Sequence, residues 1–68
     1  MSTFTAMIHR EGDLYVAECP EVGSVSQGVS IEEALENLKE ATELYLEETS
    51  YTPRARAFIT TFEAAVHA

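Results

Sequence analysis

The chain has 68 residues, of which 46% are hydrophobic, and its 12 acidic against 4 basic side chains give a formal net charge of −8. This length permits one small domain, residues 1–68. Its core is expected to be too small to stabilise the fold unless a disulfide, a metal or a partner subunit contributes. Cys19 is the single cysteine, so an intramolecular disulfide is excluded. The acidic balance argues against direct nucleic-acid binding, which needs clustered basic side chains. Without a leader or an apolar run of roughly 18 residues, the chain is expected to be cytoplasmic and free of membranes.

Three short runs in the N-terminal half have the properties of β-strands. Thr3–Arg10 alternates between apolar and polar residues, which is typical of a half-buried strand. Leu14–Cys19 follows after a polar break that contains Gly12, so the two runs predict an antiparallel hairpin. Pro20 ends the second strand because it has no amide hydrogen to donate to a ladder. A third strand is predicted over Ser24–Gln27, between two glycines.

A capping box marks the start of a helix. Ser30 precedes Glu33 by three residues, which predicts that the hydroxyl accepts the Glu33 amide while the Glu33 carboxylate accepts the Ser30 amide. No glycine or proline follows from Ile31 to about Glu48, and the pattern ends before Pro53. One stripe of this helix is predicted to face the sheet; its residues are Ile31, Ala34, Leu35, Leu38, Ala41, Thr42 and Tyr45.

A last run, from Arg56 to about His67, alternates again and predicts a fourth strand, although the alanine-rich residues 63–68 fit a short helix equally well. The predicted fold is therefore a two-layer α+β sandwich in the order β-β-β-α-β, a three- to four-stranded antiparallel sheet with one helix on one face. The other face of the sheet is left uncovered. We therefore expect a dimer or a larger homo-oligomer, formed through this face or a sheet edge, with Phe58, Ile59 and Phe62 at the interface.

The outer face of the predicted helix carries an acidic ridge, which consists of Glu32, Glu33, Glu36, Glu40, Glu43 and Glu47. Like charges four residues apart repel by about 0.2–0.5 kcal/mol in an isolated helix, and Lys39 with Glu43 is the one favourable pair of that spacing. A face of this kind suits docking of a basic protein. A solvated face that keeps the protein soluble explains the same pattern.

The sequence contains no recognisable catalytic or metal-binding constellation. Carboxylates on an exposed helix face are mobile and hydrated, and no calcium-loop motif is present. Cys19 has only His9 and His67 as conceivable bases and no nucleophile elbow, so we interpret it as a small, semi-buried structural residue. We expect no enzymatic activity, no cofactor and no metal. The rival interpretation, a hydrolase, predicts metal-dependent cleavage of RNA.

Three runs follow one another in the centre of the chain: Tyr15-Val-Ala-Glu-Cys-Pro-Glu-Val22, then Gly23-Ser-Val-Ser-Gln-Gly28, then Ser30-Ile-Glu-Glu-Ala-Leu-Glu-Asn-Leu-Lys-Glu-Ala41. In this order they resemble the N-terminal domain of HicB-family antitoxins over about residues 4–48, some two thirds of the chain. The resemblance implies a partial ribonuclease-H-like domain that binds and masks HicA, a small basic toxin that cleaves mRNA. Catalysis is not implied, because a ribonuclease needs converging metal ligands whereas these acids line the outside of a helix.

The resemblance and the acidic ridge together predict the partner-binding residues. Glu32, Glu36, Glu40, Glu43 and Glu47 are the expected charge partners, and an adjacent corner is expected from Tyr15, Glu18, Pro20 and Glu21. Two departures from the family pattern are expected to matter. Val22-Gly23-Ser24 stands where many relatives have Pro-Gly-Cys, which shortens the local turn by one residue. No C-terminal DNA-binding segment follows up to Ala68, so we do not expect direct transcriptional autoregulation. The alternative to an antitoxin is an orphan homo-oligomeric domain with a structural or ligand-binding role.

Overall fold

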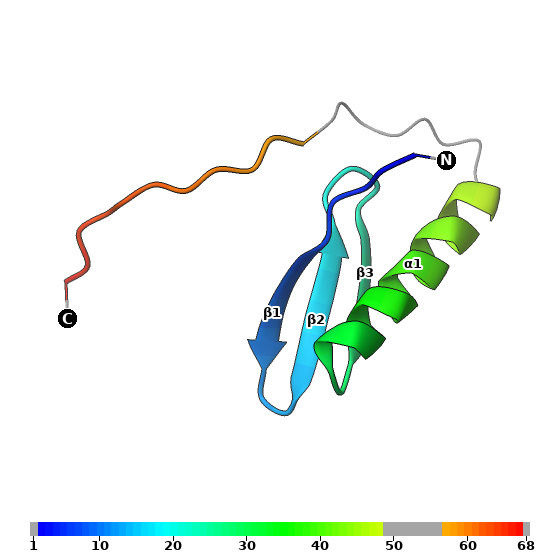
Figure 1. Cartoon of the computed structure of the whole chain (residues 1–68), viewed down its shortest axis with the longest axis horizontal. Helices are drawn as coiled ribbons and strands as arrows, with labels where there is room; N and C mark the ends of the chain where they lie inside the picture. The colour runs from blue at the N-terminus through cyan, green and yellow to red at the C-terminus, as the bar shows by residue number, and fades with distance from the viewer. Residues whose placement is uncertain (1, 49–56, 68) are drawn as a thin grey trace.

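The computed structural model describes residues 2–48 and 57–67 of the chain (Figure 1). Its elements are β1 (Met7–Glu11), β2 (Leu14–Cys19), β3 (Ser24–Gly28) and α1 (Ile31–Glu48). The strands form one antiparallel sheet in the order β1-β2-β3, and α1 lies across one face of it. The predicted two-layer α+β architecture is confirmed, with three strands in the sheet.

The first strand is shorter than predicted. β1 begins at Met7, which pairs with Glu18, so Ala6 would stand opposite Cys19, the last residue of β2, and Thr3 to Thr5 would stand opposite Pro20 and the residues after it. Pro20 follows there and has no amide to donate, which is why the alternating pattern of residues 3–6 does not extend the ladder. The predicted hairpin itself is confirmed.

The hairpin turn explains a glycine. β1 and β2 are joined by two residues, Gly12 and Asp13, between the paired Glu11 and Leu14. Gly12 has φ 62, and no other residue type in the described part of the chain has a positive φ. A two-residue loop with positive φ only at its first position is a type II′ turn, which favours glycine at that position and matches the twist of the strands.

The capping box forms with one difference from the prediction. The Glu33 amide donates to Ser30 Oγ at 3.1 Å, as expected. The Glu33 carboxylate instead accepts the amide of Val29 at 3.0 Å, one residue before the amide that was predicted. Side chains therefore still accept hydrogen bonds from two backbone amides at the start of the helix. The predicted bounds of α1 are confirmed.

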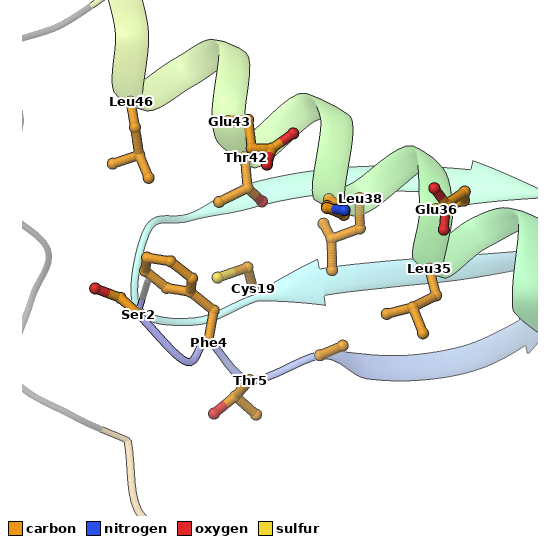
Figure 2. A pocket seen from close by; sticks show the side chains of 12 residues that line it. Ser2, Phe4, Thr5, Cys19, Leu35, Glu36, Leu38, Thr42, Glu43 and Leu46 are labelled. Carbon is orange, nitrogen blue, oxygen red and sulfur yellow. The ribbon is translucent and has the colours of Figure 1, made fainter.

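The core lies where α1 packs on β3 and β2. Its buried apolar residues are small apart from one leucine: Ala17, Cys19, Val22, Ala34 and Leu38. Between the two layers Ser24 Oγ and Thr42 Oγ1 form a buried hydrogen bond of 2.7 Å. The predicted helix stripe is partly wrong, because Ile31, Leu35 and Tyr45 are exposed. Leu35 points towards β1 (Figure 2), but α1 packs on β3 and β2, so its side chain lines an open groove instead of the core.

The predicted fourth strand is not formed. Residues 57–67 have no strand and no helix, and they run away from the sheet (Figure 1, orange to red). Phe58 and Phe62 are 96% and 89% exposed. Alternation gives a segment a strand-like face, but a strand also needs a neighbour with free backbone groups. The predicted helix-ending residues near Pro53 and the predicted strand start at Arg56 lie outside the described residues.

Candidate functional site

The acidic ridge lies on the solvent side of α1, and all six of its glutamates are exposed. Within residues 2–48 and 57–67, none of these carboxylates is in an ion pair with a basic side chain; the ion pair that forms there joins His9 and Glu11 at 2.9 Å on the sheet. Glu33 differs from the others because its carboxylate caps the helix. The remaining five present negative charge that a partner could neutralise.

An apolar groove of about 720 Å³ lies beside the ridge. Because α1 packs on β3 and β2, the surface near β1 is open, and the extended residues 2–6 form the opposite wall (Figure 2). Phe4 and Leu46 approach the groove from opposite walls, with Cys19 between them at the floor. The lining residues are Ser2, Phe4, Thr5, Ala6, Cys19, Leu35, Glu36, Leu38, Lys39, Thr42, Glu43 and Leu46. Two ridge carboxylates, those of Glu36 and Glu43, therefore border an apolar surface.

Glu21 anchors the wall that residues 2–6 form. Its carboxylate accepts the Thr5 amide at 2.9 Å through Oε1 and the Thr5 hydroxyl at 2.6 Å through Oε2. The Cys19 thiol donates to Oε1 at 3.4 Å. Glu21 is only 5% exposed. Burial of its carboxylate is tolerated because these three donors replace the hydrogen bonds that water would make. The sequence predicted a corner at Glu21 but gave no signal that Thr5 would be its partner.

The same hydrogen bonds shift the titration of Glu21. The Thr5 hydroxyl, followed by the Thr5 backbone amide, lowers the pKa of the Glu21 carboxyl from 4.5 to about 2, although burial acts in the opposite direction. A carboxyl whose pKa is lower in the folded than in the unfolded state stabilises the fold above its unfolded pKa. That contribution is lost as the pH falls from about 4.5 towards 2.

We predict that Glu21→Gln lowers the stability of the fold at neutral pH, and that the difference from the unmodified chain shrinks as the pH is lowered from 4.5 towards 2. Urea unfolding followed by circular dichroism over this pH range measures both effects. Glu40→Gln, at an exposed ridge position, is the control for losing one negative charge. A stability difference between Glu21→Gln and the parent that stays constant with pH would contradict the role of the Thr5 bonds.

The structure brings only part of the predicted corner together. Pro20 and Glu21 lie in the turn after β2, next to the groove. Tyr15 lies at the other end of β2, opposite Arg10 and Gly28. Glu18 alternates with the buried Ala17 and Cys19, so it lies on the sheet face away from α1. Leu35 and Leu46 were not predicted as site residues: Leu35 was assigned to the stripe that faces the sheet, and Leu46 lies just outside that stripe. The signal that could have identified them is an apolar side chain at the edge of the stripe.

Within the described part of the chain, no group of three or more His, Cys, Asp or Glu side chains is placed to hold a metal ion. The described helix is also too polar to cross a membrane.

Fold and site together define a small α+β domain with an acidic helix face beside an apolar groove. The chain is similar to a UPF0150 protein of Helicobacter pylori (strain J99 / ATCC 700824), with 55% identity over 42 residues. This similarity covers 60% of the chain and 58% of the relative, so the chain spans somewhat more than half the length of that protein. No protein-family model and no solved structure matches the chain.

Proposed function

We propose that this protein is an antitoxin-like binding module that neutralises a small basic toxin of the HicA type in the cytoplasm. The observation that carries the proposal is the exposed acidic ridge, whose carboxylates have no basic partner among the described residues. A toxin that grips mRNA must present a cationic surface to the phosphates. A row of carboxylates on a rigid helix can occupy that surface and compete with RNA for it.

The position of the ridge beside the groove supports a protein partner over simple solvation. Charged side chains raise the association rate and orient a partner, whereas affinity comes mainly from apolar residues that become buried at the centre of an interface. Glu36 and Glu43 border the groove, and Leu35 and Leu46 line it, so both kinds of contact are available on one side of α1. Lys39 lies among them and is available for an acidic group of the partner.

The similarity to the UPF0150 protein is consistent with the proposal, since UPF0150 is the HicB-like family. The aligned stretch covers only part of either chain, so the proposal of toxin binding is argued from the acidic ridge and not from this similarity.

The proposal is tested with the small basic protein encoded next to this chain in its genome. Expression of that protein alone is expected to stop growth and cleave mRNA, and co-expression of this chain is expected to relieve both. If such a neighbour is absent, or if its toxicity is unchanged by this chain, the antitoxin role is wrong.

We predict that the double charge reversal Glu36→Lys/Glu40→Lys weakens toxin binding at least about tenfold at low salt, because it replaces attraction to the cationic partner by repulsion. Isothermal titration calorimetry with the purified basic protein measures the change. The fold is expected to remain intact, since both positions are exposed.

The matched control is Glu11→Lys/Asp13→Lys, which changes the net charge by the same amount at the β1–β2 hairpin. We expect this variant to bind the toxin nearly as well as the parent does. Toxin binding by the parent and by this variant should weaken as salt is raised. Equal affinities for the parent and the ridge variant would remove the ridge from the interface. Equal losses in the two variants would mean that only net charge matters.

A further inference from the structure

The last described segment of the chain has an unpartnered strand-like face. Phe58, Phe62 and Val66 are separated by even numbers of residues, so they share one face of an extended chain. In the structure these three side chains are 96%, 89% and 90% exposed. Thr60 and Ala64 lie between them on this face. A group of large apolar side chains exposed together marks a surface that contacts another surface.

The sheet has one edge suited to receive such a segment. β1 and β3 are the two edges, and the carbonyl of Gln27 in β3 already accepts the Asn37 side chain of α1 at 2.9 Å. No strand among residues 2–48 and 57–67 lies along the outer side of β1. An edge strand left open in this way offers a row of backbone donors and acceptors to an added strand.

The open edge adjoins the apolar groove. Ala6 immediately precedes β1 and lines the groove together with Phe4, Leu35 and Leu46. A strand added beside β1 would turn alternate side chains towards the helix layer, which is the side on which the groove lies. The open side of the groove has no apolar side chains to cover its lining, and the exposed apolar side chains of residues 57–67 could supply them.

We propose that residues 57–67 of one copy add to the β1 edge of a second copy and insert Phe58 and Phe62 into its groove, so that two chains exchange their C-terminal segments. Within one copy the segment does not fold back, since its large apolar side chains are exposed while the groove of the same copy is open (Figures 1 and 2). Because the exchange is reciprocal, the two copies are related by a two-fold axis and the β1 edge of each copy is paired. Each copy also gains apolar side chains next to its small core. The exchange can be tested without the toxin, but both use the same groove, so a toxin that reaches Leu35 and Leu46 would have to displace the exchanged segment.

The exchange predicts a dimer of the full-length chain at micromolar concentration, with slow amide hydrogen exchange in both β1 and residues 57–67. Phe58→Asp/Phe62→Asp is expected to raise the dimer dissociation constant by at least about 100-fold, because charged groups cannot enter an apolar groove. Sedimentation velocity measures the assembly state, and far-UV circular dichroism checks that the three-stranded sheet and the helix persist.

The matched control is Val25→Asp, an exposed apolar position of β3 on the sheet face away from α1. Strand exchange leaves that face open, so this variant should remain dimeric. Dissociation by Val25→Asp would instead assign the dimer to the open face. A monomeric parent with protected amides in residues 57–67 would show that the segment closes its own groove, and a monomer without that protection would also overturn the exchange.

Discussion

Truncation of Leu38 to alanine is expected to destabilise the protein by about 2–5 kcal/mol, which is the usual range for removing a buried leucine from a core. Leu38 is 4% exposed and is the largest aliphatic member of the core cluster, whose other residues are no larger than valine. The groove lies directly against it, so the lost volume would open towards solvent and not be refilled by neighbouring side chains. Urea unfolding monitored by circular dichroism measures the change.

Leu44→Ala is the matched control for Leu38→Ala. It removes the same atoms from the same helix at a position that is 54% exposed. Its effect on stability should stay within about 0.5 kcal/mol, as is normal for surface substitutions. Similar losses for the two variants would mean that α1 does not pack through the side that carries Leu38.

Replacement of Gly28 by alanine is expected to cost about 1–3 kcal/mol, because an added methyl group would overlap the helix backbone. A Cβ atom there would lie 2.6 Å from the Ala34 amide nitrogen and 2.9 Å from the carbonyl carbon and Cβ of Glu33. Backbone atoms of a capped helix cannot move aside singly, so the first turn of α1 would have to shift away from β3. Thermal unfolding and amide chemical shifts measure the two consequences.

Gly23→Ala provides the comparison for Gly28→Ala. Gly23 has φ 90 and no atom within 4 Å of an added Cβ, so its substitution costs backbone strain without a clash. Chemical-shift changes should concentrate in the turn between β2 and β3 for Gly23→Ala and in the first turn of α1 for Gly28→Ala. Identical shift patterns would contradict the close approach of the helix to β3.

The sequence predicts correctly the elements that depend on residues close along the chain, and it fails for those that depend on residues far apart in the sequence. The bounds of β2 and α1 follow from neighbours along the chain, such as Pro20 and the Ser30 cap, and the sequence was sufficient for both. The end of β1 and the absence of a fourth strand depend on whether a partner strand is available. Alternation within a segment contains no information about that partner.

The candidate site shows the same division. The acidic ridge follows from helical periodicity alone, so the sequence is sufficient to place each of its glutamates on the outer face. The groove depends on where α1 crosses the sheet, which is set by contacts such as the approach to Gly28. The bond between Thr5 and Glu21 joins residues 16 positions apart, and nothing in either local pattern indicates it.

Cys19 is a built-in probe of how often the helix and the sheet separate. It is the single thiol of the chain, is 1% exposed, and lies at the floor of the groove between the helix and residues 2–6. A thiol-labelling reagent can therefore reach it only when the helix or the N-terminal wall moves away. The labelling rate of the unmodified protein would report how often the two layers separate, and a ligand or subunit that fills the groove would slow that rate.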